Sequence, residues 1–204
     1  MRTFIALELP SPIREAIRLR QQQLRDALTE AGLARCFRWS AVENIHLTLR
    51  FLGETDRGQT ERIAAGLAEI ARRRQGFSLC VGGAGCFPNF RRPNVIWLGV
   101  DGQLELLQAM QAAVEELVVA AGFEAESRGF SPHLTLARAQ RERSRADLQR
   151  AGELLQRLAV QNEGNVQGGS APCFAVTEVV HMRSDLRPAG PIYTPLSVHP
   201  LMGG

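Results

Sequence analysis

Histidine and threonine occur together in a pattern that could carry out acid–base chemistry. The chain has four histidines, and two of them begin the same tetrad, His-Leu-Thr-Leu, at residues 46–49 and 133–136. Imidazole titrates near pH ~6.5, so at neutral pH one ring can accept a proton while another donates one. Threonine hydroxyls can hydrogen-bond to phosphate oxygens. Two such pairs facing one cleft would suit displacement at phosphorus, with the histidines as acid and base.

The tetrads place these groups only if they lie on strands. Side chains alternate between the two faces of a strand, so each histidine would share a face with the threonine two residues later, ~6.6 Å along the strand. The same alternation predicts a core face and a cleft face for the first tetrad. Ile45, Leu47, Leu49 and Phe51 are expected on the core face, and His46, Thr48 and Arg50 on the cleft face. His133 and Thr135 are expected on the cleft face of the second strand.

The order of expected elements repeats along the chain. Apolar patterning, prolines and glycines predict strands at 2–9, 44–52, 77–81, 95–100, 130–138, 174–182 and 192–198, helices at 13–33, 56–74, 103–121 and 143–158, and loops at 82–94 and 161–170. Strand, helix, tetrad strand, helix and strand occur once in each half. We therefore interpret residues 1–204 as a single domain built of two interleaved, duplicated lobes.

Further segments extend the pattern beyond the tetrads. They are residues 2–10 (RTFIALELP), 44–54 (NIHLTLRFLGE), 95–99 (VIWLG), 131–138 (SPHLTLAR) and 193–196 (YTPL). In this order they resemble the 2H phosphoesterase superfamily with its paired H-x-T-x motifs. The nearest branch is the RNA 2′,3′-cyclic phosphodiesterases, also called 2′-5′ RNA ligase-like or LigT-like proteins. The resemblance covers nearly the whole chain.

The resemblance implies a fold and a reaction. Alternation of strands and helices by itself would favour a parallel α/β sheet. The family instead implies an α+β fold of two pseudo-symmetric lobes, each a largely antiparallel sheet with outer helices, around a central cleft. It implies hydrolysis of an RNA terminal 2′,3′-cyclic phosphate to a 2′-phosphate, and an activity that could join RNA ends through a 2′-5′ linkage. His46 would protonate the leaving oxygen as proton donor and His133 would activate water as proton acceptor, although the near-symmetric halves do not order the two.

The resemblance also implies the phosphate ligands. Thr48 and Thr135 would bind the phosphate, and Arg138 would add a charge-assisted contact. Strict alternation, however, places Arg138 on the face of Leu134 and Leu136. The strand must end or bulge after Leu136 if Arg138 is to reach the phosphate.

Other residues are weaker candidates. Phe4 and Trp97 lie in corresponding strands of the two halves and could stack on a base or simply fill the core. Arg50 could face the cleft or the solvent. Two arginine runs, 72–74 and 91–92, could hold RNA backbone, although charge runs are usually solvated. His181 and His199, which lack a following threonine, are expected to be structural.

Composition limits the class of protein. The chain has 204 residues, 45% hydrophobic and 22% charged, and no apolar run long enough to span a membrane, which is typical of a globular cytoplasmic protein. Its four cysteines are scattered and are expected to be free thiols. No Cys, Asp or Glu lies beside either tetrad histidine at ligand spacing, so we expect no metal and no cofactor. All 24 basic residues are arginine, but the net charge is only +3.

Three functions remain open on these grounds. The leading one acts on RNA with 2′,3′-cyclic phosphate ends, of which tRNA fragments could be an example, as a monomer without membrane association. A second is a 2H phosphoesterase for a small cyclic nucleotide such as ADP-ribose 1″,2″-cyclic phosphate. The third is a non-catalytic RNA-binding protein that uses the same cleft.

Overall fold

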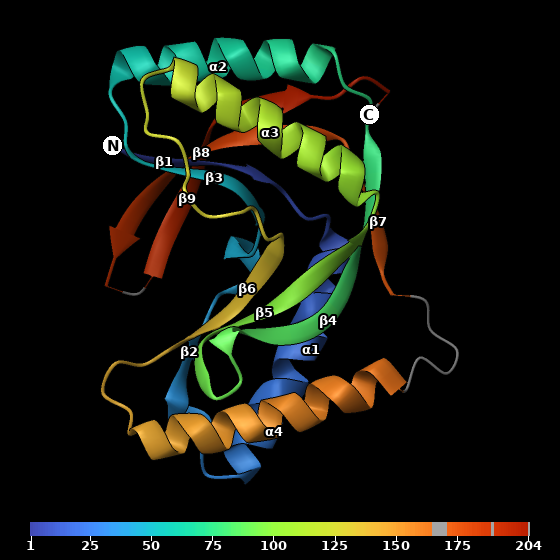
Figure 1. Ribbon diagram of the computed structural model, residues 1–204, viewed down its shortest axis with the longest axis vertical. Coiled ribbons are helices and arrows are strands. Elements are labelled where there is room, and N and C mark those ends of the chain that lie inside the picture. The colour runs from blue at the N-terminus through green and yellow to red at the C-terminus, as the bar shows by residue number, and fades with distance from the viewer. Residues whose placement is uncertain (165–170, 189, 204) are drawn as a thin grey trace.

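Two antiparallel sheets form the centre of the molecule (Figure 1). The computed structural model describes residues 1–164, 171–188 and 190–203. The first sheet has the strand order β3 (Leu47–Glu54), β1 (Arg2–Leu7), β8 (Glu178–Arg187), β9 (Gly190–Pro200). The second has the order β2 (Phe37–Trp39), β6 (His133–Ala139), β5 (Arg92–Gly102), β4 (Phe77–Asn89), β7 (Cys173–Val176). All pairings between these strands are antiparallel, so the α+β prediction is confirmed and the parallel alternative is excluded.

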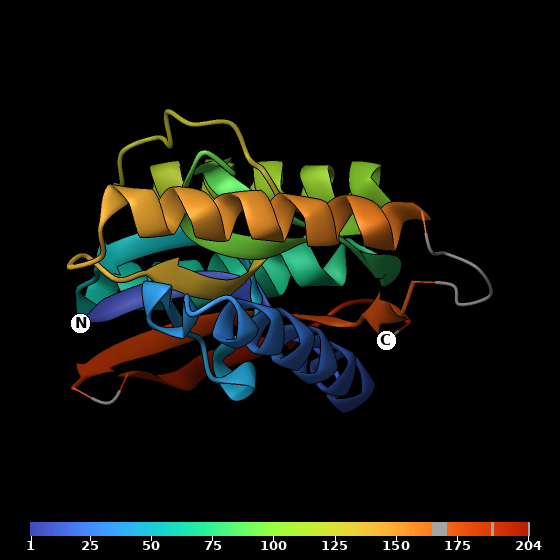
Figure 2. The same cartoon turned by 90° about the horizontal axis from the view of Figure 1, so that it is seen from below.

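Four helices cover the outer faces of the sheets. Helices α2 (Arg57–Arg72) and α3 (Leu104–Ala120) pack on each other and on strands of the first sheet. Helices α1 (Ser11–Glu30) and α4 (Arg145–Gly164) lie together at the opposite end, beside the second sheet (Figures 1 and 2). Helix α1 thus follows a strand of the first sheet and reaches the second, while α3 follows a strand of the second sheet and packs on the first.

Helix α2 shows how the sequence sets these elements. Asp56 and Gln59 form a capping box, in which the Asp56 carboxylate accepts from the Gln59 backbone N–H at 2.7 Å. This satisfies backbone donors that a helix start leaves without a partner. Ile63, Leu67 and Ala71 follow at four-residue spacing and are buried, so one stripe of the helix faces the core.

The predicted loop at residues 82–94 is wrong, because most of it is a hairpin. Strand β4 continues to Asn89 and β5 begins at Arg92. Glycines weaken the sequence pattern that predicts a strand, but one glycine here is needed because a neighbouring side chain occupies the space of its Cβ. A Cβ at Gly85 would lie 2.3 Å from the Trp97 ring, so glycine makes room for the indole on the paired strand.

Other segments also differ from expectation. The single strand predicted at 174–182 is two strands, β7 and β8, which belong to different sheets. The short strand β2 was not predicted, since three residues carry too little periodicity to be recognised. Helix α4 extends to Gly164, which makes the predicted loop at 161–170 wrong for its first four residues. The rest of that loop, 165–170, lies outside the described residues.

The cysteine expectation is only half correct. Cys36 and Cys86 are free and buried, but Cys80 and Cys173 form a disulfide between paired strands β4 and β7. The two are 93 positions apart, and only the register of the second sheet brings them together.

Among the described residues, no helix is both long and apolar enough to cross a membrane.

Candidate active site

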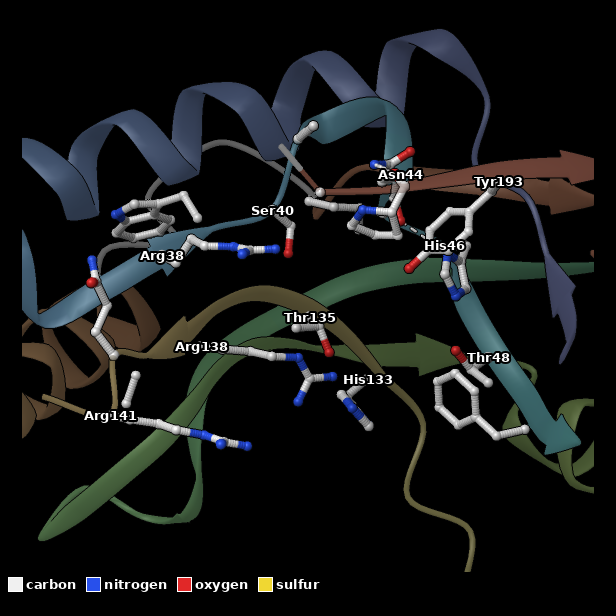
Figure 3. Close-up of a pocket in the computed structure, with 18 of the residues that line it drawn as sticks. Arg38, Ser40, Asn44, His46, Thr48, His133, Thr135, Arg138, Arg141 and Tyr193 are labelled. Atoms are coloured by element: carbon white, nitrogen blue, oxygen red, sulfur yellow. Dashed lines mark hydrogen bonds between the residues drawn. The ribbon is translucent and has the colours of Figure 1, made fainter. Parts of the chain in front are cut away.

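A pocket opens where β3, at the edge of the first sheet, meets β6 of the second sheet. Its volume is about 550 Å³, within the range of small-molecule sites. Both tetrads contribute their histidine and threonine to it. Figure 3 shows these four side chains projecting into the same space, His46 from the residue just before β3, Thr48 from β3, and His133 and Thr135 from β6. The tertiary structure thus brings together the two motifs that the sequence separates by 87 positions (133 − 46).

The two histidines are held in the same way. The Nδ1 atom of His46 lies 2.9 Å from the Asn44 carbonyl oxygen, and that of His133 lies 2.8 Å from the Ser131 carbonyl oxygen. A carbonyl oxygen can only accept, so each Nδ1 carries the proton. In the neutral ring this leaves the Nε2 lone pair free to accept a proton, and in the imidazolium Nε2 donates one.

The surroundings of His46 are mainly apolar. The Phe4 ring stacks on it with centroids 4.5 Å apart, and the Tyr193 ring meets it edge-on at 5.2 Å. Burial lowers the pKa of His46 to about 4, with a smaller effect in the same direction from the Arg14 charge and an opposing one from the Asn44 carbonyl. The ring is therefore neutral near pH 7 unless an anion lies beside it.

His133 has a different set of neighbours. The Phe87 ring meets it edge-on with centroids 4.9 Å apart, and Trp97 packs behind Phe87 at 5.0 Å. Aromatic contacts on one side thus fix the plane of each imidazole ring, but His133 has no stacked ring comparable to Phe4 on His46 among the described residues.

Both threonine hydroxyls are available to a ligand. Thr48 and Thr135 line the pocket and are half-buried, and neither hydroxyl has a hydrogen bond within the part of the chain that the structure describes. Each can therefore donate to an acceptor such as a phosphate oxygen.

A bulge at the last residue of each tetrad changes which side chains follow into the pocket. The register of β1 with β3 skips Leu49, and that of β5 with β6 skips Leu136. An extra residue in one strand of a pair reverses the face of the sheet to which each later side chain in that strand points. Two residues after each bulge, Phe51 and Arg138 therefore line the pocket at equivalent positions.

The bulges settle three expectations about orientation. Arg138 reaches the pocket by the bulge that the sequence required for it. Phe51, expected in the core, is 60% exposed. Arg50, expected on the cleft face, does not line the pocket. Its guanidinium instead pairs with Glu115 at 2.7 Å and Glu126 at 3.8 Å on the other side of the strand.

A buried glutamine of α1 supports the second bulge. Gln21 is 5% exposed, and its Nε2 donates to the carbonyl oxygens of Leu136 and Ser40, each at 3.0 Å. The Ser40 N–H also donates to the Leu136 oxygen at 2.8 Å. The bulged carbonyl is therefore fully satisfied, and the chain turns Arg138 toward the pocket without leaving a buried polar group unpaired.

The remaining sequence candidates do not line the pocket. Phe4 is 2% exposed behind His46, and Trp97 lies behind Phe87, so neither offers a face to a base there. In the run 72–74, two arginines pair with Glu69, and the 91–92 pair lies at the turn between β4 and β5.

The two other histidines also lie outside the pocket. His181 is fully buried in β8, and burial lowers its pKa to about 4, with a smaller effect from His199. The Nε2 atom of His199 is hydrogen-bonded to the Ser197 hydroxyl at 2.8 Å. Both positions agree with the expected structural roles.

Several residues that line the pocket were not predicted to do so. They are Arg38 and Trp39 of β2, Arg141 in the turn before α4, Phe51 and Tyr193. The β2 pair belongs to a strand that the sequence did not reveal. The sequence did contain a signal for Tyr193, because residues 193–196 formed part of the family resemblance. No group of three or more potential metal-ligating side chains was found among the described residues.

Comparisons with known proteins identify relatives of this chain. The family model described as LigT like Phosphoesterase matches the chain twice, at residues 7–97 and 98–193. The RNA 2′,3′-cyclic phosphodiesterase of Methanothermobacter thermautotrophicus is 34% identical over 97% of both chains. That of Thermus thermophilus is 33% identical over 100% of this chain and 91% of its own.

Solved structures show the same architecture. E. coli LigT complexed with 3′-AMP superposes with a TM-score of 0.71 at 26% identity, covering 98% of both chains. TT0787 of Thermus thermophilus superposes with a TM-score of 0.70 at 26% identity, covering 100% of this chain and 99% of that one. Since the family model matches both halves and the relatives align over nearly the full length, the chain belongs to the LigT-like phosphoesterase family.

Proposed function

We propose that this protein hydrolyses the 2′,3′-cyclic phosphate at the end of an RNA chain to a 2′-phosphate. The observation that carries the proposal is the pocket in which two histidines, each with Nδ1 hydrogen-bonded to a carbonyl oxygen, face the same space as two threonine hydroxyls that have no hydrogen bond among the described residues. The names of the relatives support the same substrate.

The roles follow from this arrangement. Thr48, Thr135 and Arg138 hold the non-bridging oxygens of the cyclic phosphate. His133 takes a proton from water as its oxygen bonds to phosphorus, and His46 donates a proton to the 3′-oxygen as its bond to phosphorus breaks. The net change is addition of one water, and the two rings regain their starting states by exchange with solvent.

The low pKa of His46 in the apolar pocket is compatible with its role as acid. A phosphate anion in contact with the ring favours the imidazolium and so raises the pKa of His46 when the substrate binds. The same site can also join RNA ends. If a 5′-hydroxyl replaces water as the nucleophile and the 3′-oxygen leaves, the product is a 2′-5′ linkage.

The test is hydrolysis of an RNA oligomer ending in a 2′,3′-cyclic phosphate, with EDTA present. His46→Ala and His133→Ala should each lower the rate by ~10²–10⁴ if both rings transfer protons. His199→Ala, which lies outside the pocket, is the control and should retain activity. Losses below tenfold in both tetrad variants would contradict the mechanism, and no turnover by the wild type would contradict the function.

A substrate with a good leaving group assigns the two histidines. Nitrophenolate leaves without protonation, so bis(4-nitrophenyl) phosphate does not need the acid. We expect His46→Ala to lose much less activity on this diester than on the RNA, and His133→Ala to lose activity on both. The reverse pattern would make His133 the acid and His46 the base.

Tight RNA binding without turnover, unchanged in the histidine variants, would instead indicate a binding protein.

We also propose that the protein acts as a monomer in the cytoplasm and that tRNA fragments are among its substrates. Light scattering of the purified protein tests whether it is a monomer. End analysis of RNA from cells that lack the protein tests whether tRNA fragments are substrates.

A further inference from the structure

One end of the pocket extends well beyond the tetrads. Besides the four tetrad side chains, it is lined by β2 and by the turn that joins β6 to α4. Three arginines project from this region: Arg38, Arg138 and Arg141 (Figure 3). A cyclic phosphate held by the threonines and Arg138 needs only one of them.

The three arginines are neighbours along one edge of the pocket, two on paired strands and one in the turn that follows. Arg38 of β2 is the register partner of Arg138 of β6, so their backbones are one strand spacing apart, ~4.8 Å. Arg141 follows three residues after Arg138, in the turn. Because β6 begins with His133, the row starts beside the histidines and leads away from them.

All three guanidinium groups, that of Arg138 included, lack a hydrogen-bond or ion-pair partner among the described residues. Arg38 and Arg141 are exposed, and neither makes a hydrogen bond or ion pair within the described residues. Some arginines elsewhere are paired with carboxylates, as in Arg57 with Glu61 and Arg183 with Asp185, and others, such as Arg35, have no such partner among the described residues. Within the pocket, Glu142 is the one acidic residue among those that line it, so this end keeps a positive charge.

The opposite end of the pocket has another character. Phe51 and Tyr193 line it near His46, and Phe51 occupies the position equivalent to Arg138 after its own bulge. The pocket is therefore positively charged in one direction only, and Trp39 of β2 lies at that end beside the arginines. A bound anionic chain would extend toward the arginines, and a neutral ring would lie at the aromatic end.

We propose that Arg38 and Arg141 form a subsite for the phosphodiester on the 5′ side of the terminal nucleotide. Guanidinium forks match phosphate oxygens and form charge-assisted hydrogen bonds with them. This inference rests on the proposed function and makes it more specific. The substrate class is an oligonucleotide with at least one internal phosphodiester, in preference to a free cyclic mononucleotide.

The test compares two substrates of the same chemistry. One is uridine 2′,3′-cyclic phosphate, and the other is a uridine trinucleotide that ends in the same group. The wild type should show a higher kcat/KM on the trinucleotide. Arg38→Ala and Arg141→Ala should each reduce that preference by about tenfold, mainly through KM. Each variant should also make the salt dependence of trinucleotide binding less steep, by ~0.7 in the log–log slope for each phosphate that is no longer bound by an arginine.

Arg35→Ala is the matched control. Arg35 is an exposed arginine three residues before Arg38 and does not line the pocket, so its loss removes the same charge from the same region. It should keep the wild-type preference. Melting temperatures identify any variant that fails to fold, and for such a variant Arg→Gln replaces Arg→Ala.

The outcomes separate this subsite from the reaction itself. Hydrolysis of both substrates by the wild type with equal kcat/KM would overturn the subsite and leave the proposed function intact. Equal losses on both substrates in the arginine variants would likewise overturn it. Failure of the wild type to hydrolyse either substrate would overturn the proposed function and, with it, this inference.

Discussion

Gln21 links a buried hydrogen-bond pattern to the orientation of Arg138. Its amide donates to the carbonyl oxygens of Ser40 and Leu136, and Leu136 is the residue that bulges from β6. Leucine is similar in size to glutamine and suits a helix, so Gln21→Leu removes the donor with little change in packing. After the substitution the Leu136 oxygen still accepts from the Ser40 N–H, but the Ser40 oxygen loses this donor.

The size of the effect follows from these hydrogen bonds. Two of them at about 1 kcal/mol each give a decrease of roughly 2 kcal/mol in the free energy of unfolding. For a chain of this length that corresponds to a fall in Tm of about 4–8 °C. A bulge held less firmly misplaces Arg138, and we expect kcat/KM on a cyclic-phosphate substrate to fall roughly tenfold.

The control is the neighbouring residue. Gln22 is exposed and is hydrogen-bonded to Asp26, so Gln22→Leu should change stability by less than about 0.5 kcal/mol and leave activity unchanged. Stability is measured by denaturant unfolding, and activity by release of the 2′-phosphate product.

A double-mutant cycle distinguishes positioning from general destabilisation. If Gln21 acts through Arg138, then Gln21→Leu should lower activity in the wild type but have little further effect in an Arg138→Ala background. Equal fold-losses in both backgrounds, or unchanged activity in a destabilised Gln21→Leu variant, would refute the argument.

Three further predictions concern stability. His181 is fully buried with its pKa lowered to about 4, so the unfolded chain, in which it titrates near ~6.5, binds its proton first. Its titration should lower stability by roughly 3 kcal/mol as pH falls from 6.5 to 4, in addition to the effect of His46, whose pKa is also lowered to about 4, and urea unfolding measures the sum. Reduction of the Cys80–Cys173 bond, which closes a loop of 93 positions, should cost about 2–4 kcal/mol, measured by unfolding with and without reductant. Gly85→Ala would place a methyl group 2.3 Å from the Trp97 ring and should cost about 1–3 kcal/mol, measured in the same way.

Each of these has its own control. His181→Gln should flatten the pH dependence, and an unchanged slope would show that other groups cause it. Cys173→Ser should abolish the response to reductant, and a persistent response would place its origin elsewhere. Gly129→Ala, at a glycine with no atom within 4 Å of its added Cβ, should be nearly neutral, and an equal loss at both glycines would contradict the steric reason.

Local chemistry in the sequence was enough to predict much of the site. The repeated tetrad, alternation on strands and the family resemblance together predicted that His46, Thr48, His133 and Thr135 share a pocket, and the structure brings them together. The helix predicted at 56–74 is similarly local, since the capping box and the buried stripe that the structure shows in α2 lie within one or two helical turns.

Strand register was beyond the reach of that reasoning. Bulges at Leu49 and Leu136 depend on how β1 and β5 pair with the tetrad strands, and they decided that Phe51 and Arg138 enter the pocket while Arg50 leaves it. The sequence therefore determined which groups could perform the chemistry. The tertiary structure decided which neighbours accompany them. One added residue in a strand reverses the side chains beyond it, which brought in Phe51 and Arg138, and the pairing of the three-residue strand β2 with β6 brought in Arg38.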